Sequence, residues 1–389
     1  MFDGSSWHDG PVQVLVTEGK IAAVGDPAPL PETVELLDLG ETTLLPGLVD
    51  AHTHLTWDAG PDAVARVSTG SREELMAQAR RSASAALAVG ITTVRDLGDR
   101  DYVSVELRDE FRADPSSGPE IIASGPPVTI RGGHCGFLGG EAETPAELAQ
   151  AVEDRLAHGV DVIKVMATGG EMTPAGLKPY QSQYDLVRLT ALADAAHRGG
   201  LPITAHAHGA AGAVDAIRAG FDCIEHAGFW TETSAVLPPA DLEALVARGT
   251  LVVATPAGRG LFDPAFVPPA IAARFAAMMD VFASMRAAGV TPAYASDAGI
   301  GPVKPHDVLA FSLPRAVASG LSVADALRAM TIVAARACGA DDRKGRIKTG
   351  HDADLLAVVG DPRIDADALA HTHTVVRAGV VVRPAEAGC

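Results

Sequence analysis

The chain has 389 residues, 47% hydrophobic and 4% aromatic, with a formal net charge of −18 at pH 7. This composition supplies a large core and excludes a disordered chain. The acidic balance disfavours binding to a nucleic-acid backbone or an anionic membrane surface, and no apolar run reaches the ~18 residues expected of a membrane span.

The two ends of the chain contain short β patterns. Residues 11–25, "PVQVLVTEGKIAAVG", predict a hairpin with its turn near Glu18 and Gly19. Residues 353–382 contain a second set of β runs, "ADLLAVVGD" and "TVVRAGVVV". We expect residues 1–45 and 345–389 to combine into one small β-sandwich domain.

A repeating unit fills the middle of the chain: a helical stretch ends in glycine, and a Val/Ile/Thr-rich run follows at once. Such runs are typical of buried parallel strands, and glycine past a helix end adopts the left-handed conformation cheaply. The glycines are Gly90, Gly159, Gly200, Gly220, Gly249 and Gly289. With "TLLPGLVDAHTHL" and "PEIIASGPPVT", these runs make eight strand candidates that alternate with helices. They predict an α/β fold, a (β/α)8 TIM barrel over residues 46–344. A doubly wound open sheet is the alternative, but no G-x-G-x-x-G follows the first strand.

Polar residues fall near the ends of the predicted strands, where the active sites of such barrels lie. His52 and His54 close the first strand, and their spacing of two places both imidazoles on one face. The other candidates follow the repeat glycines: Lys164, His206, His226 and Asp297. Imidazole and carboxylate ligands suit a divalent ion such as zinc. The sequence therefore predicts a metal site at the barrel mouth.

Lys164 is the unusual member, because an ammonium group does not ligate a cation. A buried ammonium costs several kcal/mol unless it is compensated. One interpretation is that Lys164 reaches the barrel mouth and pairs with a carboxylate. The other is that its amine reacts with CO2, and the resulting N6-carboxylysine bridges two metals. We favour the second because the histidines surround it.

The motifs "LLPGLVDAHTHL", "DVIKVMATGG", "TAHAHG", "CIEHAGF" and "ASDAG" resemble the amidohydrolase superfamily. The closest likeness is to its imidazolonepropionase-like or Xaa-Pro-dipeptidase-like subgroup, and "RGGHCGFLGGEAE" is similar to a loop of that subgroup. The resemblance implies two divalent ions, expected to be zinc. It assigns His52, His54, Lys164 and Asp297 to one ion, and Lys164, His206 and His226 to the other. His208 shares a face with His206 and is the alternative ligand.

The resemblance also implies a mechanism. A hydroxide that bridges the two metals attacks the substrate carbonyl, with its pKa lowered to roughly 7. Asp297 acts as general base and then as general acid toward the leaving nitrogen. His134 or His208 donates a hydrogen bond to the carbonyl oxygen. We expect hydrolysis of an amide bond in a dipeptide or N-acyl amino acid.

Other functions stay open. A cyclic amide or imide hydrolase, a lactonase or a deaminase can use the same scaffold. Deaminases of this superfamily lack the lysine of the fourth strand, which is present here as Lys164. A non-catalytic scaffold protein is the alternative from another class, and it predicts missing ligands.

Long loops rich in glycine and proline are expected to set specificity. The candidate substrate contacts in or near them are Arg131, Tyr180, Tyr184, Arg259 and His306. His306 lines the pocket or caps a helix. Glu225 either supports a metal ligand or forms a salt bridge outside the barrel, and Asp96 is expected to cap the next helix.

The four cysteines form no C-x-x-C pair and indicate no disulfide framework. The start, "MFDGSSWHDG", shows no basic and apolar leader pattern. We therefore expect a cytoplasmic protein with a small-molecule substrate, no nucleic-acid or membrane partner, and a homo-oligomer as one option.

Overall fold

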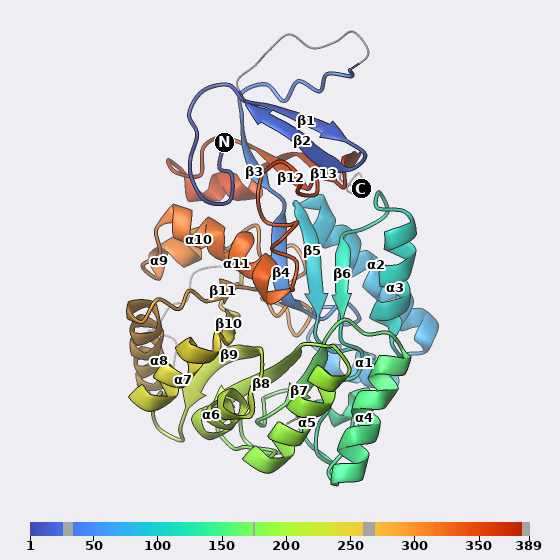
Figure 1. The fold of residues 1–389 in the computed structure, drawn as a ribbon, viewed down its shortest axis with the longest axis vertical. Helices are drawn as coiled ribbons and strands as arrows, with labels where there is room; N and C mark the ends of the chain where they lie inside the picture. Colours follow the sequence, from blue (N-terminus) through green and yellow to red (C-terminus); the bar gives the residue numbers. More distant parts are fainter. Residues whose placement is uncertain (26–33, 174–175, 260–268, 383–389) are drawn as a thin grey trace.

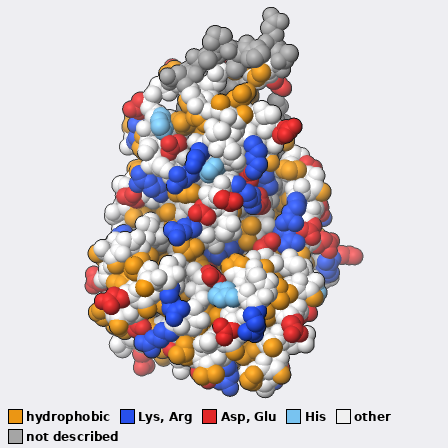
Figure 2. Space-filling model, viewed as in Figure 1, with side chains coloured by type: hydrophobic (Ala, Val, Ile, Leu, Met, Phe, Trp, Pro, Cys, Tyr) orange, Lys and Arg blue, Asp and Glu red, His pale blue; other side chains and the backbone are white. Residues whose placement is uncertain are grey.

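The structure is a computed structural model, and it describes residues 1–25, 34–173, 176–259 and 269–382. Figure 1 shows parallel strands flanked by helices, with a smaller group of strands from both chain ends at the top of the view. On the face in Figure 2, acidic and basic side chains are interspersed, so this face presents no broad basic surface. Within the described ranges, no helix is both long and apolar enough to cross a bilayer.

The parallel strands form two sheets. One contains β4 (Leu48–Thr53), β5 (Ile91–Asp96) and β6 (Glu120–Ala123); the other contains β7 (Ile163–Met166), β8 (Ile203–Gly209), β9 (Cys223–Trp230), β10 (Leu251–Ala254) and β11 (Ala293–Tyr294). Backbone hydrogen bonds link the two sheets at both edges. Val128, beyond β6, donates to the carbonyl of Lys164 at 2.8 Å, and Asp297, beyond β11, donates to the carbonyl of His52 at 2.7 Å. The eight predicted strands are therefore parallel neighbours in chain order.

Helices follow most of these strands. They are α1 (Ala63–Thr69), α2 (Arg72–Ala88), α3 (Val103–Ala113), α4 (Pro145–Ala157), α5 (Leu186–Arg198), α6 (Ala210–Ala219), α7 (Pro239–Arg248), α8 (Pro269–Ala287), α9 (Leu313–Ala318), α10 (Val323–Ala329) and α11 (Ile332–Ala337). Capping boxes open α2 at Ser71 and α4 at Thr144. Gly220 and Gly249 end α6 and α7 in the left-handed conformation, with φ of 90° and 67°. These local signals position the strands that carry the site.

The chain ends pair with each other. An antiparallel sheet has the order β14 (Val380–Val382), β13 (Thr372–Arg377), β12 (Leu355–Val359) and β3 (Thr42–Pro46). The predicted hairpin is confirmed as β1 (Gln13–Thr17) and β2 (Lys20–Gly25), with Glu18 and Gly19 both at positive φ. Ile21 of the hairpin shares a buried cluster with Leu44 and Val376 of the sheet. The hairpin therefore packs on the sheet through its apolar side chains.

A buried ion cluster lies between β6 and the segment before β12. The ammonium of Lys344, 1% exposed, lies 3.0 Å from Glu120, 2.8 Å from Asp352 and 2.6 Å from Asp354. We expect Lys344→Ala to lower the free energy of unfolding by about 3–5 kcal/mol, because it removes the buried cation that pairs with the buried Asp354 and with two partly buried carboxylates. Urea unfolding measures this value.

Lys20→Ala is the matched control. Lys20 pairs with the same Asp352, but its side chain is 51% exposed. Exposed pairs contribute only about 0–1 kcal/mol. Equal losses of unfolding free energy in the two variants would show that the burial of Lys344 does not account for the contribution of its ion pairs.

The same cluster predicts instability in acid. Burial opposes ionisation of Glu120, but the hydrogen bond from Arg343 and the charge of Lys344 outweigh it and hold its pKa at about 2. The folded pKa lies below the ordinary value, so this stabilisation is complete above about pH 4.5 and is lost as the pH falls toward 2. We expect the urea midpoint to fall over this range, and Glu120→Gln to flatten the fall.

Candidate metal centre

The first group of ligands comes from β4 and the segment after β11. His54 Nε2 lies 3.2 Å from an oxygen of Asp297, and His52 Nε2 lies 3.5 Å from the same oxygen. His52 uses its Nδ1–H to donate to Glu225, and His54 uses its Nδ1–H to donate to the carbonyl of Gly98. In neutral imidazoles the two Nε2 atoms are then acceptors that face a carboxylate. Three acceptor atoms that face one another in a buried place fit a cation.

The second group comes from β8 and β9. One ligand atom each from His206, His208 and His226 lies within 4.8 Å of the others. The ring centroids of His206 and His226 are 4.6 Å apart, and those of His208 and His226 are 4.3 Å apart. His206 Nε2–H donates to the carbonyl of Gly169 at 3.1 Å, which leaves Nδ1 as its acceptor atom. This group also fits a divalent ion.

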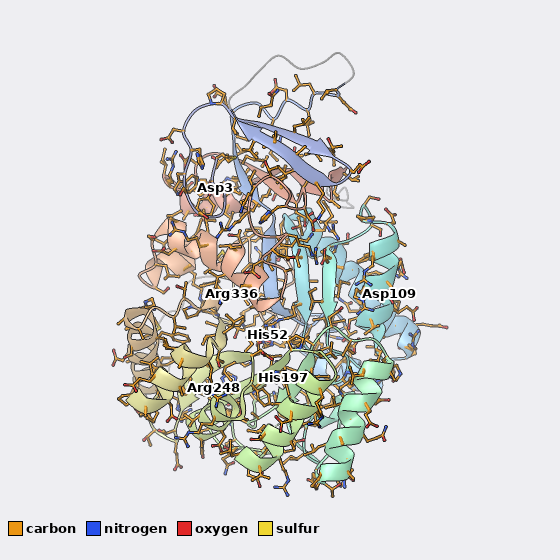
Figure 3. All side chains as sticks on the ribbon, in the orientation of Figure 1. Asp3, His52, Asp109, His197, Arg248 and Arg336 are labelled. Carbon is orange, nitrogen blue, oxygen red and sulfur yellow. The ribbon has the colours of Figure 1, made fainter. Side chains whose placement is uncertain are left out.

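The two groups adjoin each other. The ring centroids of His52 and His226 are 4.8 Å apart, and both residues line one cavity with Lys164. His52 lies in the interior, where the two parallel sheets meet (Figure 3). The structure therefore brings together all six residues that the sequence predicted as ligands.

Within the described part of the chain, the amine of Lys164 makes no ion pair or hydrogen bond, although the residue is only 1% exposed. Burial lowers the pKa of Lys164 to about 8, against the opposing charge of Glu225. A substantial fraction of the amine is therefore neutral slightly above neutral pH. The neutral amine is the form that reacts with CO2.

The electrostatics of the site suit metal binding. Burial lowers the pKa of His52 to about 4 and that of His208 to about 4, and it lowers the pKa values of His206 and His226 well below the ordinary value. Burial opposes ionisation of Asp297, but the adjacent imidazoles of His54 and His52 and the ammonium of Lys304 hold its pKa far below the ordinary range. Neutral imidazoles and an ionised carboxylate are the forms that bind metals.

Two of the ligands lie on strained backbone. His226 has φ of 64° and Asp297 has φ of 57°, in the left-handed region that residues other than glycine rarely adopt. Strain of this kind costs about 1–3 kcal/mol and clusters at functional sites. The fold therefore holds these two side chains toward the cavity at an energetic cost.

Glu225 contacts the first group through a hydrogen bond with His52. Its Oε2 accepts from His52 Nδ1–H at 2.8 Å, and its Oε1 accepts from Arg95 at 2.6 Å. Both Glu225 and Arg95 are buried. Glu225 thus contacts the candidate ligand His52 inside the fold, and a salt bridge outside the barrel is wrong. Arg95, in "TTVRDLG", was missed by the sequence reasoning.

Glu225→Gln is expected to weaken the affinity for the first metal by about 10–100-fold. The single amide oxygen of glutamine cannot accept from both His52 and Arg95. Chelator competition measures the affinity. Glu171→Gln is the control, because Glu171 lines the same cavity but is exposed. Equal affinity of the Glu225 variant and the unmodified protein would contradict the supporting role.

His134 lies beside the second group. Its ring centroid is 4.5 Å from that of His206, and its Nδ1 is buried without a hydrogen-bond partner. Burial, followed by the charge of His208, lowers the pKa of His134 to about 3. His134 therefore lines the cavity as a neutral imidazole.

The structure places the predicted substrate contacts elsewhere. Arg131 is exposed and pairs with Glu147 at 2.6 Å, and Arg259 pairs with Asp307 at 2.6 Å. Tyr184 is buried and donates to the carbonyl of Ala142 at 2.7 Å. These residues are not among the described residues that line the cavity.

His306 and Tyr180 are also not among the described residues that line the cavity. His306 is buried, and its Nε2–H donates to the carbonyl of His54 at 3.0 Å. The ring of Tyr180 lies 5.9 Å from the guanidinium of Arg274. Asp96 accepts from the amides of Leu55 at 2.7 Å and Gly98 at 3.2 Å, so the expected helix cap is wrong. Direct substrate contact by the five candidates stays a prediction.

The cavity that the two groups line has a volume of about 1150 Å³.

A model of the amidohydrolase family matches residues 43–384. The chain belongs to the amidohydrolase family. The superfamily predicted from the sequence motifs is thereby confirmed.

Relatives of known activity support the assignment. The chain is 26% identical to an ochratoxinase from Aspergillus niger, over 90% of this chain and 78% of the relative. It is 27% identical to an imidazolonepropionase from Cupriavidus pinatubonensis, over 88% and 82%. Its structure matches that of a Xaa-Pro dipeptidase with bound methionine in the active site, with a TM-score of 0.83, 26% identity and coverage of 98% and 97%.

These similarities establish a TIM-barrel-like α/β fold for this member of the amidohydrolase family. They also identify the chain as a hydrolytic enzyme that acts on carbon–nitrogen bonds in small molecules. Members of the family generally use divalent metals, for which the chain offers the two ligand groups described above.

Proposed function

We propose that the chain hydrolyses an amide bond in a dipeptide or an N-acyl amino acid, with two divalent metals in its site. The observation that carries this proposal is the convergence of two three-residue ligand groups on one cavity that Lys164 also lines. The similarity to the Xaa-Pro dipeptidase favours a dipeptide. The similarity to imidazolonepropionases makes a cyclic amide the second candidate.

Zinc is the expected ion, because histidine nitrogens and a carboxylate are its usual ligands in catalytic sites. His52, His54 and Asp297 would hold one ion, and His206 and His226 the other. N6-carboxylysine at Lys164 would contribute to both. The buried amine makes no ion pair or hydrogen bond among the described residues, which supports this modification. When bound, such ions polarise a carbonyl and lower the pKa of water.

Asp297 is the general base and acid. It is buried, ionised and set on strained backbone at the cavity wall. It accepts a proton from the attacking water and passes it to the leaving nitrogen. His134 has a buried ring nitrogen without a partner and donates to the carbonyl oxygen. His208 is the alternative donor.

We also propose that the eight parallel strands form one closed barrel over residues 46–344. The hydrogen bonds between β4 and the segment after β11, and between β7 and the segment after β6, support closure. Residues 1–45 and 345–389 form the second domain, a small β-sandwich. The apolar packing of the β1–β2 hairpin on the four-stranded sheet supports this arrangement.

Metal analysis and a substrate screen test the proposed function. Protein produced with added zinc should contain close to two ions per chain and hydrolyse at least one member of a panel of dipeptides and N-acyl amino acids. Imides and lactones belong in the same panel. Less than one ion per chain and an inert panel would favour a non-catalytic scaffold.

A further inference from the structure

The cavity continues from the metal ligands toward α8. The ring of His208 stacks on the indole of Trp230, with centroids 4.6 Å apart and an interplanar angle of 15°. Phe275 of α8 stands edge-on to Trp230, at 6.2 Å and 82°. A chain of aromatic contacts therefore leads from the second ligand group to the first half of α8.

Beyond these rings the cavity wall is mostly apolar, although Arg286, Arg315, Ser319 and Asp325 also line it. Met278, Met279 and Phe282 line it from α8, and Ala318 and Leu321 line it from α9 and the segment that follows. Methionine side chains are flexible and adapt to ligands of different shape. We call this part of the cavity, bounded by these five residues with Trp230 and Phe275, the α8 compartment.

The volume of the cavity exceeds the need of a small dipeptide. At about 1150 Å³, it lies above the ~300–1,000 Å³ that is usual for sites that hold drug-sized ligands. A dipeptide at the metal centre would leave most of the α8 compartment unfilled. Apolar surface of this extent favours a ligand that removes it from water.

Three donors in the cavity wall lack partners. The indole nitrogens of Trp57 and Trp230 and the hydroxyl of Tyr294 are buried, with no hydrogen bond in the described structure. Trp57 is 1% exposed and Tyr294 is 4% exposed. A buried donor without a partner is unfavourable. The aromatic rings that carry these donors line the cavity and add apolar surface to its wall.

We propose that the substrate is an amide with a large apolar group, aromatic or long-chain, on one side of the scissile bond. This group lies in the α8 compartment while the amide lies at the metal ligands. The inference rests on the proposed amide hydrolysis and narrows its substrate class.

Two substrate series test the inference on the metal-loaded full chain. One series is N-acyl glycines with acetyl, octanoyl, dodecanoyl and naphthoyl groups, and the other is acetamides of amines of the same sizes. In one series, kcat/KM should rise at least about 100-fold from the smallest to the largest member, because each buried methylene adds to binding. The series that shows the rise identifies the side of the bond that bears the group. Hydrolysis without dependence on size in either series overturns the inference and leaves the proposed function intact.

A binding measurement tests the α8 compartment independently of hydrolysis. Trp57 and Trp230 line the cavity, so their fluorescence reports on its occupation. N-Dodecanoylglycine should change this fluorescence at micromolar concentration, and N-acetylglycine should not. Binding of the long compound without hydrolysis of any amide supports the compartment and contradicts the proposed function. If neither compound binds, the inference fails.

Variants at exposed positions narrow the compartment without disturbing the core. Ala276→Trp on α8 and Ala318→Trp on α9 place indoles at residues that line it. Each should lower the ratio of kcat/KM for the large substrate to that for the acetyl substrate by at least about 10-fold. Ala273→Trp is the control, because Ala273 is exposed on the same helix outside the lining. If this ratio changes equally in all three variants, or does not change in the Ala276 and Ala318 variants, the apolar group does not lie in the α8 compartment.

Discussion

Replacing Lys164 with alanine should remove at least one of the two metals and lower kcat/KM by about 10⁴-fold or more, as losses of residues that act as a unit do. Lys164 lines the same cavity as the two histidine groups, and its amine makes no ion pair or hydrogen bond among the described residues. If its carbamate bridges the ions, its removal takes one ligand from each. Elemental analysis after gel filtration and assays on the best substrate of the screen measure the two effects.

Lys348→Ala is the matched control, because Lys348 is exposed and lies outside the metal cavity. It should keep both the metal content and the rate. Formate or acetate should partly rescue Lys164→Ala, since a small carboxylate can occupy the place of the carbamate. Two metals and a full rate in Lys164→Ala would contradict the bridging role.

The carbamate itself has a separate test. Enzyme equilibrated with ¹³C-bicarbonate should show a carbamate carbon in its NMR spectrum, and Lys164→Ala should not. A metal-loaded, active enzyme without this signal would show that Lys164 acts as an amine. The ligand role of the histidines would then stand without the modification.

The positions of the candidate ligands could be predicted from the sequence because they depend on local pattern. The spacing of His52 and His54 fixes one face of a strand, and a glycine at each helix end marks where the next strand begins. Parallel strands then bring their carboxyl ends to one edge, so residues far apart in the chain meet. These rules do not depend on the side chains that lie between the candidate ligands in the sequence.

The choice between the two interpretations of Glu225 could not be made from the sequence. Alternation along β9 predicts that Glu225 and His226 point in opposite directions. The left-handed backbone at His226 and Ala227, with φ of 64° and 48°, interrupts this alternation. Glu225 therefore reaches His52 while His226 also faces the cavity. A bend of this kind depends on tertiary packing and leaves no local signal in "CIEHAGF".

Loop charges were uninformative for a different reason. Arg131 and Arg259 lie in loops near the predicted barrel mouth, but each has a carboxylate partner on the protein itself. Arg259 also lies over the ring of Phe311, 3.9 Å from its centroid. The position of a charged side chain in a loop depends on such neighbours, which the order of residues does not reveal.

Asp297→Asn is expected to keep both metals and to lower kcat by about 10²–10⁴-fold, the usual contribution of general acid–base catalysis. The amide oxygen can still face His52 and His54 at 3.2–3.5 Å, as the carboxylate oxygen does. It cannot accept a proton. Steady-state kinetics and metal analysis should therefore show a fall in kcat with little change in KM or metal content.

The variant also separates proton transfer from ligation, which Lys164→Ala does not. If Asp297 were only a ligand, the asparagine variant would lose metal affinity and excess zinc would restore its rate. If it carries the proton, excess zinc changes nothing. A substrate with a better leaving group should then recover part of the lost rate, since it needs less protonation of the nitrogen. Asp154→Asn, at a carboxylate in a surface pair with His158, should leave all these quantities unchanged. A kcat within 10-fold of the unmodified enzyme would remove Asp297 from the proton pathway, and the base would then have to be sought among the remaining side chains of the cavity.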